Sequence, residues 1–454
     1  MSAPKREQWN SSLGFILAAA GSAIGLGNIW RFPYITGQNG GGTFVLLYVS
    51  IVLLIGLPVM YLELSMGRFS KRGPVGAVES IAPGSFWKFM GYLAVITGIG
   101  ILSFYGVVAG WTVWYFFKAV FHGFPSGKTN ELFGEFVASG PHQIALLYIF
   151  LALTGGIVIS GIKGGIEKVS SILMPILLLL LTGLIIYSMT LKGATSGLKY
   201  YLVPKSSDFT KTTFIFALGQ AFFSLSLGMG AMMTYGSYLK KKENLVKAGF
   251  LVVIFDTVIA LMSGLIIFPV LGGAPQKSGA GLVFVVITDL FTKLPGGRIL
   301  AALFFLLLTV AALTSTISLL EVAASYLMDE HKIPRKKAAT IVTFITFIVG
   351  IPSALSLGAN KSLTSMISIG GQKTGFLGIM DFLFGNVSLA LGGLLLILFV
   401  VFKWGIKNTE KELFRNSEKL KYLRYILRPL IWFAAPAAIA LVLGFILFTG
   451  KTLS

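Results

Sequence analysis

The chain has 454 residues, of which 55% are hydrophobic and only 12% are charged, with a formal net charge of +20. Soluble domains carry roughly 25% Asp, Glu, Lys and Arg, so this composition excludes an ordinary water-soluble protein, and its hydrophobicity also excludes a disordered chain. The absence of cysteine excludes disulfides, thiolate metal sites and a cysteine nucleophile. We therefore expect an integral membrane protein.

The predicted elements are long uncharged runs that recur along the whole chain. Each is at least about 20 residues, the length that crosses a bilayer as a helix, and none alternates as the strands of a membrane barrel do. They predict eleven spans, at residues 8–30, 32–62, 89–117, 136–162, 169–191, 212–239, 257–276, 299–320, 338–360, 382–402 and 429–450. The seventh is expected to begin near Ala248 and carries one acid, Asp256.

The 37 lysines and arginines lie almost entirely between these runs. Nucleic-acid-binding patches cluster on one face of a folded domain, whereas basic loops of membrane proteins stay cytoplasmic, so we expect membrane topology and no nucleic-acid partner. A cytoplasmic N-terminus places roughly two-thirds of the basic residues inside, and the odd number of spans then places the C-terminus outside. The start also resembles a signal peptide, but its apolar run continues as far as Phe32, which favours a retained span.

The first and sixth spans contain glycines that predict interrupted helices. The first span carries Gly25-Leu26-Gly27, and the sixth carries Gly228-Met229-Gly230 after two serines. Close helix packing is the alternative, because small residues let backbones approach. Asn28 and Arg31 are costly in lipid, however, and non-helical backbone at this depth is tolerated only where it lines a cavity. The occurrence of these glycine pairs in both the first and the sixth span favours two inverted five-helix repeats, each beginning with a discontinuous helix.

Such breaks place helix ends with free N–H donors and helix ends with free carbonyl acceptors at the middle of the membrane. The second half-helix begins with free N–H groups that suit a carboxylate. The first half-helix ends in free carbonyls that suit an ammonium group or Na⁺. The pattern therefore predicts a site for a zwitterion accompanied by cations, and an amino acid is such a zwitterion.

Several motifs resemble the neurotransmitter:sodium symporter family. They are GSAIGLGNIWRFP at 21–33, NGGG at 39–42, GLP at 56–58, ELSMGR at 63–68, GQAFFSLS at 219–226 and ALTS at 312–315. The resemblance implies an all-α polytopic LeuT-type fold of the bacterial hydrophobic amino-acid transporter type, although most relatives have twelve spans. Its parts are expected to be an N-terminal cytoplasmic segment at 1–11, the first repeat at 12–191, the second repeat at 212–404, a cytoplasmic linker at 405–424 and the eleventh helix at 425–450.

The resemblance also implies two Na⁺ sites. The first would use the Ala23 carbonyl with Asn28, Ser224 and Asp256. The second would use the carbonyls of Gly21, Ile24 and Ala311 with the hydroxyls of Thr314 and Ser315, an oxygen set that suits a hard monovalent cation. In the structural alternative, these two hydroxyls bond back to carbonyls of their own helix.

For the substrate, the resemblance implies that the Tyr105 hydroxyl holds the carboxylate. Tyr105 lies near the middle of its run, away from the interfaces where membrane tyrosines usually act as anchors. The full expected set is Ser22, Ala23, Gly25, Leu26, Gly27, Ile101, Tyr105, Phe223, Ser224, Ser226, Met229, Ser315 and Leu319. This largely apolar wall suits bulky hydrophobic side chains, although the same composition would serve as ordinary packing.

Gates are implied at both ends of the pathway. The outer gate would pair Arg31 with Asp381, with Gln220 and Phe223 as companions. The inner gate would pair Arg6 with Asp329, surrounded by Trp9, Ser237 and Tyr238. In the fifth span, Gly165 and Pro175 would mark a site of unwinding, or simply a helix start and a tolerated kink.

We therefore expect a sodium-coupled importer of hydrophobic or aromatic L-amino acids in the plasma membrane, without an organic cofactor. Animal relatives with an amide at the position of Asp256 depend on chloride, so the carboxylate here predicts chloride independence. A channel or an amino-acid-binding sensor is the alternative. An enzyme is not expected, because no nucleophile with a base and no paired carboxylates occur at membrane depth.

Overall fold

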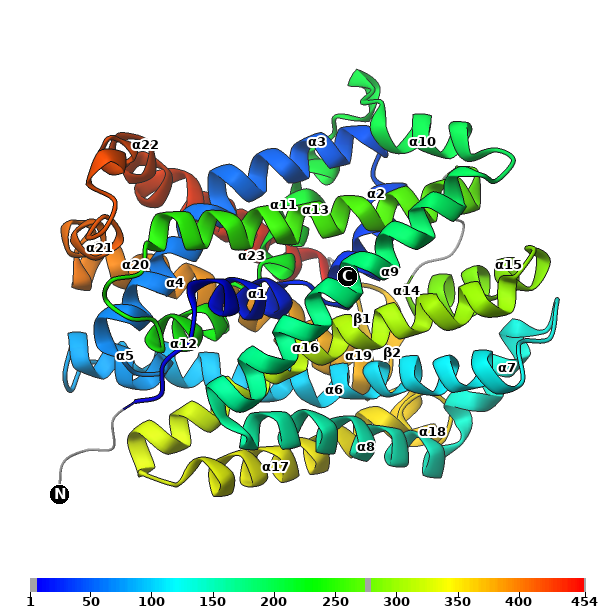
Figure 1. Cartoon of the computed structure of the whole chain (residues 1–454), viewed down its shortest axis with the longest axis horizontal. Helices are drawn as coiled ribbons and strands as arrows, with labels where there is room; N and C mark the ends of the chain where they lie inside the picture. The colour runs from blue at the N-terminus through cyan, green and yellow to red at the C-terminus, as the bar shows by residue number, and fades with distance from the viewer. Residues whose placement is uncertain (1–5, 274–278, 453–454) are drawn as a thin grey trace.

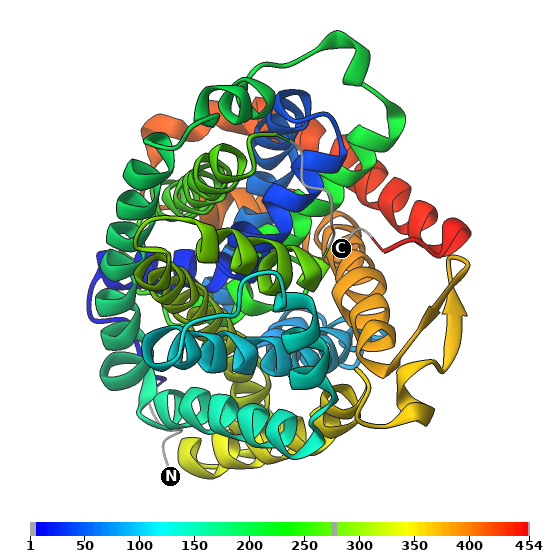
Figure 2. The same cartoon turned by 90° about the vertical axis from the view of Figure 1, so that its right-hand side faces the viewer.

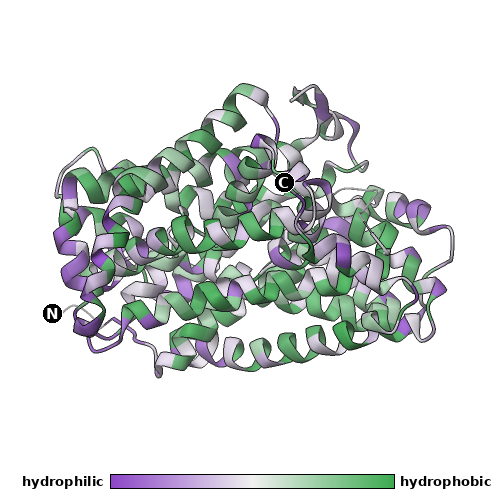
Figure 3. Cartoon of the chain, turned by 90° about the horizontal axis from the view of Figure 1, so that it is seen from above, coloured by the Kyte–Doolittle hydropathy of each residue, from purple (hydrophilic) through white to green (hydrophobic). Residues whose placement is uncertain are grey.

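The computed structural model describes residues 6–273 and 279–452. Most of its helices run along the long axis of the molecule (Figure 1), and the view from one end shows them packed side by side (Figure 2). Hydrophobic residues dominate the middle of the bundle, while hydrophilic residues gather at its two ends (Figure 3). This distribution matches a bundle that crosses a bilayer, with its polar ends in the two aqueous phases.

The first five spans come from the N-terminal half of the chain. Their elements are α1 (Ser12–Ala23), η1 (Gly27–Arg31) and α2 (Phe32–Gln38); α3 (Gly42–Ile51), η2 (Val52–Gly56) and α4 (Leu57–Ser70); α6 (Lys88–Phe121); α8 (Gly140–Ile159); and η3 (Ile162–Glu167) and α9 (Lys168–Met189).

The remaining six spans follow in the same manner. Their elements are α11 (Lys211–Ser224) and α12 (Ala231–Ser237); α13 (Leu245–Leu271); α16 (Gly297–His331); α17 (Arg335–Leu355); α19 (Phe376–Met380), η6 (Asp381–Ser388), α20 (Leu389–Phe399) and η7 (Val400–Trp404); and η8 (Glu418–Leu423), α22 (Arg424–Pro429), η9 (Leu430–Ala434) and α23 (Ala435–Thr449).

Short elements join the spans. They are α5 (Pro74–Ile81), α7 (Thr129–Ala138), α10 (Ala194–Leu202), η4 (Ser206–Asp208), α14 (Gly279–Gly281), η5 (Leu282–Ile287), α15 (Thr288–Lys293), α18 (Lys361–Thr364), α21 (Ile406–Leu413) and the antiparallel hairpin of β1 (Ile367–Ile369) and β2 (Gln372–Thr374).

The eleven predicted spans are recovered within the described ranges. Nine are continuous helices long and apolar enough to cross a membrane, and a tenth is the bent pair of α1 with η1 and α2, whose parts meet at 54°. The eleventh is α11 and α12, which are separated by the non-helical segment 225–230. The two interrupted helices are therefore the first and the sixth, as the glycine pattern predicts.

Some predicted boundaries are wrong. The first span continues beyond Arg31 to Gln38, because Arg31 is buried against protein rather than lipid. The second span consequently runs from Gly42 to Ser70 instead of 32–62, which brings Glu63 inside a membrane helix. The predicted linker contains the helix α21, and the all-α description omits the small hairpin β1–β2.

Two long helices, α6 and α16, pack along each other through the middle of the bundle. The half-helix α1 packs against α9, α13 and α16, and α12 packs against α4 and α16. Both interruptions therefore lie inside the protein, where neighbouring helices rather than lipid can satisfy the freed backbone groups.

Candidate functional site

At the break in the first span, the backbone lies in close contact with the side chains of Ser315 and Tyr105. Ile24 has an extended backbone, with φ −72° and ψ 108°. A Cβ added at Gly25 would lie 2.6 Å from the Ser315 hydroxyl and 2.8 Å from the Tyr105 hydroxyl. Only glycine leaves room for both hydroxyls, and the Leu26 N–H then donates to the Tyr105 oxygen over 2.8 Å.

At the break in the sixth span, residues with a left-handed backbone conformation interrupt the helix. Gly228 has φ 85°, and a Cβ there would overlap the Leu389 carbonyl oxygen. Ser226 also lies in the left-handed region, at φ 53°, which costs a non-glycine residue about 1–3 kcal/mol. Its hydroxyl donates to the Ser22 carbonyl over 3.1 Å, so the strained residue ties the two breaks together.

Glu63, for which the sequence predicts no role, stabilises the second half of the sixth span. Its buried carboxylate accepts the N–H of Gly228 over 2.7 Å and the N–H of Met233 over 3.2 Å. A carboxylate at the start of a helix satisfies free N–H groups and complements the helix dipole. An acid in an apolar helix is itself a signal of such a role, but the predicted end of the second span placed Glu63 outside the membrane.

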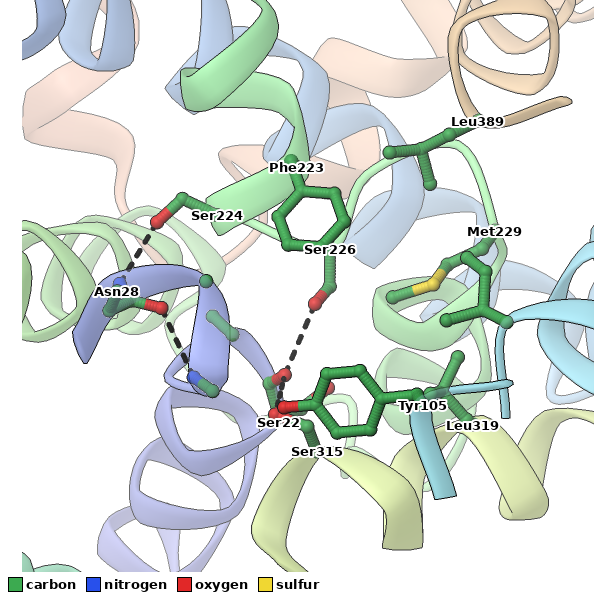
Figure 4. A pocket seen from close by; sticks show the side chains of 14 residues that line it. Ser22, Asn28, Tyr105, Phe223, Ser224, Ser226, Met229, Ser315, Leu319 and Leu389 are labelled. Atoms are coloured by element: carbon green, nitrogen blue, oxygen red, sulfur yellow. Dashed lines mark hydrogen bonds between the residues drawn. The ribbon is translucent and has the colours of Figure 1, made fainter. Parts of the chain in front are cut away.

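A narrow cavity of about 40 Å³ lies between the two breaks (Figure 4). The lining comes from both interrupted helices and from α6, α16 and α20, through Ser22, Ala23, Gly25, Gly27, Asn28, Ile101, Tyr105, Phe223, Ser224, Ser226, Met229, Ser315, Leu319 and Leu389.

Twelve of the thirteen residues expected at the substrate site line this cavity. The exception is Leu26, which lines the next chamber outward and contributes its backbone N–H to Tyr105. Leu389 was not predicted, since an apolar residue in an apolar helix carries no sequence signal. Met229 lies in the non-helical segment, two residues before α12 begins.

One polar cluster adjoins the cavity where the first span meets α11 and α13. The Asn28 amide donates to Asp256 Oδ1 over 2.7 Å and to the Ser224 hydroxyl over 2.9 Å, and Ser224 donates to Asp256 Oδ2 over 2.7 Å. Tyr48, which was not predicted, donates to Ser224 over 3.0 Å. Ala23 and Asn28 both line the cavity. Three of the four residues expected at the first Na⁺ site, Asn28, Ser224 and Asp256, are therefore in direct contact.

A second group of oxygens lies between α1 and α16. The Thr314 hydroxyl is 3.0 Å from the Ala311 carbonyl oxygen and 3.4 Å from that of Ile24, and the Ser315 hydroxyl is 3.1 Å from the Ile24 oxygen. A Cβ at Gly21 would lie 3.2 Å from the Thr314 Cβ, so these backbones approach closely. The bond from Thr314 to Ala311 stays within one helix, but the bonds to Ile24 cross to the broken one.

This second group fits a small hard cation by its donor chemistry. Each member is a neutral oxygen, and the described residues contain no group of three His, Cys, Asp or Glu side chains that could hold a transition metal. Carbonyl and hydroxyl oxygens are the ligands that hard cations prefer.

An outer chamber of about 280 Å³ lies next to the cavity, and Arg31 and Asp381 both line it. Their opposite charges attract each other, and the Arg31 guanidinium lies 3.9 Å from the centre of the Phe223 ring. Gln220 donates to the Gly27 carbonyl over 3.1 Å. All four residues expected at the outer gate therefore lie next to the break in the first span.

The residues expected at the inner gate also come together. Arg6 forms an ion pair with Asp329, donates to the Ser237 hydroxyl and lies over the Tyr238 ring, 4.5 Å from its centre. Trp9 donates to the Tyr235 carbonyl and packs edge-on against Tyr238.

The fifth span is helical from Ile162 to Met189 in this structure. Gly165 lies in its first turn, against the carbonyl of Ile157 in the preceding helix, and Pro175 lies inside the continuous helix α9. Both positions here match a helix start and a tolerated proline, so unwinding between them stays a prediction.

Comparison with known proteins agrees with this arrangement. The model of the sodium:neurotransmitter symporter family matches residues 6–138 and 131–369. The chain is 37% identical over 447 residues to the uncharacterized sodium-dependent transporter YhdH of Bacillus subtilis, covering 97% of this chain and 98% of that protein. It is 34% identical to an uncharacterized sodium-dependent transporter of Methanocaldococcus jannaschii, covering 95% and 90% of the two chains.

Among solved structures, that of MhsT in complex with L-phenylalanine matches with a TM-score of 0.88 and 40% identity, over 98% of this chain and 100% of that one. The predicted LeuT-type fold, with its two inverted repeats and an eleventh helix, is thereby confirmed. The chain belongs to the sodium:neurotransmitter symporter family and is a sodium-dependent, multi-pass membrane transporter.

Proposed function

We propose that the protein imports hydrophobic and aromatic L-amino acids together with Na⁺, by alternating access around the central cavity. The observation that carries this proposal is the cavity itself, which is mostly apolar and lies between two helix breaks that offer backbone groups of both polarities. A phenylalanine complex of the similar protein MhsT supports the same substrate class.

The substrate carboxylate is assigned to the break in the first span. Leu26 donates its N–H to Tyr105, and a phenol that accepts one bond keeps its own proton for a carboxylate. The side chain of the amino acid would then extend towards Ile101, Phe223, Met229, Leu319 and Leu389, which are all apolar. This wall favours large apolar side chains over charged ones.

Two Na⁺ ions are proposed beside the substrate. The first would be held by Ala23, Asn28, Ser224 and Asp256, of which only Asp256 can carry a charge. The second would be held by Gly21, Ile24, Ala311, Thr314 and Ser315. Coupling follows because the same helix break supplies ligands to both ions and to the amino acid, so that each ligand helps to order the site for the others.

Transport needs the two gates to open in turn. We assign the outer gate to Arg31, Asp381, Gln220 and Phe223, and the inner gate to Arg6, Asp329, Trp9, Ser237 and Tyr238. The bias of basic residues favours a plasma-membrane orientation with the N-terminus in the cytoplasm and the C-terminus outside. We assign the first inverted repeat to residues 12–191 and the second to residues 212–404.

A thermal-shift panel of the twenty amino acids, with and without Na⁺, tests the proposal. Ligand at 100 times its Kd stabilises a protein by about 2.7 kcal/mol, so phenylalanine, tryptophan and leucine should raise the melting temperature only in Na⁺. Stabilisation by charged amino acids alone would contradict the assigned substrate class.

Met229→Phe is expected to shift preference from aromatic towards smaller aliphatic substrates. Met229 lines the cavity, and a rigid ring in place of a flexible thioether reduces the space for a second ring. Competition between tryptophan and leucine for uptake measures the shift. Met232→Phe, in the neighbouring half-helix but outside the lining, is the matched control. An unaltered ranking in Met229→Phe would show that residue 229 does not contact the substrate.

A further inference from the structure

The linker between the tenth and eleventh spans, together with the adjoining ends of both spans, carries a concentration of positive charge that the proposed transport site does not use. Residues 403–428 contain eight lysines and arginines but only three acids. The elements α21 and α22 lie together at one end of the molecule (Figure 1), which is also one of its two hydrophilic ends (Figure 3).

The helix α21 is fixed to the transmembrane core. The fully buried Arg68 of α4 donates to the Glu412 carboxylate over 2.6 Å and to the Glu243 carbonyl over 2.6 Å. Arg415 contacts the other carboxylate oxygen of Glu412 over 3.2 Å. The neighbouring Leu413 is buried as well. The basic residues of α21 are therefore part of a helix that is anchored to the transmembrane core, not of an irregular loop.

A hollow of about 510 Å³ lies beside α21, and we call it the linker hollow. It is lined by Lys407, Glu410, Lys411, Phe414, Arg415, Glu418, Lys421 and Arg424.

Both carboxylates of the linker hollow are already neutralised. Arg428 makes two bonds to Glu410, at 2.6 and 2.8 Å, and Lys421 pairs with Glu418 over 2.9 Å. Within the described residues, Lys407, Lys411 and Arg424 have no carboxylate partner. The buried Nε of Arg424 has no hydrogen-bond acceptor in this part of the structure. An anion with several oxygens is the ligand that such a group of cations accommodates.

Exposed aromatic residues occur in η7, α22 and η9, the elements that precede and follow the linker in the chain. Tyr425 is 66% exposed, Phe433 is 72% exposed, and Trp432 packs edge-on against the exposed Phe402. Tryptophan and tyrosine side chains, such as those of Trp432 and Tyr425, are enriched at the level of lipid headgroups. They therefore favour a ligand whose charge sits at the membrane surface over one dissolved in the cytoplasm.

We propose that the linker hollow binds the phosphodiester headgroup of an anionic phospholipid in the cytoplasmic leaflet. In this proposal Lys407, Lys411 and Arg424 contact the phosphate, and Tyr425 and Trp432 lie at the headgroup level. The assignment to the cytoplasmic leaflet rests on the membrane orientation proposed above. The assignment of a phosphodiester as the ligand does not. Basic clusters immediately cytoplasmic of a membrane helix are suited to anionic lipids through charge attraction.

The test compares the full-length protein in nanodiscs of phosphatidylcholine with and without phosphatidylglycerol. The variant Lys407→Gln/Lys411→Gln/Arg424→Gln removes three cations, of which only Arg424 has a side-chain partner within the described part of the chain, the Tyr425 hydroxyl and ring. The control Lys163→Gln/Lys336→Gln/Lys337→Gln removes three exposed cations elsewhere on the predicted cytoplasmic side. Phosphatidylglycerol retained by the protein is counted by native mass spectrometry after extraction, and the melting temperature is measured in each nanodisc.

We expect the wild type and the control to retain phosphatidylglycerol and to melt at a higher temperature in its presence, while the linker variant loses both effects. Equal retention in all three proteins would overturn the site, and so would equal loss in the control. A stabilisation reproduced by inorganic phosphate in phosphatidylcholine nanodiscs would overturn the lipid assignment in favour of a soluble anion. Neither readout requires transport, so failure of the proposed function would leave this result unaffected.

Discussion

Asp256→Asn is expected to raise the Na⁺ concentration for half-maximal uptake at least tenfold. The carboxylate is fully buried and bonds to Asn28 and Ser224, which makes it the one formal charge of the first proposed Na⁺ site. Two unit charges 4 Å apart attract by about 4 kcal/mol at an effective dielectric constant of 20. The amide keeps one oxygen and therefore part of this energy, and each 1.4 kcal/mol corresponds to about a factor of ten in affinity.

The same residue underlies the expected chloride independence. Ala260 lies one helical turn after Asp256 and offers no side-chain oxygen or nitrogen, so we expect the negative charge at this site to come from Asp256 itself. Replacing chloride by gluconate should leave wild-type uptake unchanged, and chloride should restore part of the activity lost in Asp256→Asn. Thr257→Val is the control, because Thr257 bonds only to the carbonyl of Val253 in its own helix. A large loss of wild-type uptake in gluconate would refute this account of Asp256.

Thr314→Ala and Ser315→Ala are each expected to weaken Na⁺-dependent substrate binding by about tenfold or more. Each removes one neutral oxygen from a site that has no formal charge, and a hydrogen bond or ligand contact to a charged group is worth about 1.5–3 kcal/mol. Sodium titration of substrate binding measures the effect, which should appear in the Na⁺ midpoint more than in binding at saturating Na⁺.

Thr316→Ala separates this loss from a general loss of stability. Thr316 lies on the same helix and is equally buried, but its hydroxyl bonds to the Leu313 carbonyl and to Thr154. Its Na⁺ midpoint should match that of the wild type. If neither Thr314→Ala nor Ser315→Ala changes the midpoint, the second ion must bind elsewhere.

Features that interrupt a regular pattern could be predicted from the sequence. Glycine pairs in two otherwise apolar helices locate both breaks, because non-helical backbone inside a membrane needs a cavity and polar neighbours. Asp256 stood out for the same reason. The resemblance of motifs then placed Thr314 and Ser315 beside Ile24, although 290 residues separate Thr314 from Ile24 in the chain.

Features created by packing could not be predicted in this way. Leu389 lines the cavity only because α20 passes the glycine at 228, and Tyr48 reaches Ser224 from a helix that looks uniformly apolar. Glu63 was misplaced because a span predicted from an uncharged run ends at the first charged residue, which here is Glu63 itself. A buried Arg31 that stacks on Phe223 does not end a helix, and only the tertiary structure provides that partner.

Uptake of labelled L-phenylalanine into proteoliposomes, driven only by an inward Na⁺ gradient, distinguishes sodium-coupled import from binding alone and from passive flow. We expect the amino acid to accumulate above its external concentration. This accumulation should disappear when K⁺ replaces Na⁺ or when the Na⁺ gradient is dissipated, and Asp256→Asn should abolish it at low Na⁺. Binding of phenylalanine without accumulation would indicate a sensor, and equilibration without Na⁺ would indicate a channel. Either result would contradict sodium-coupled import.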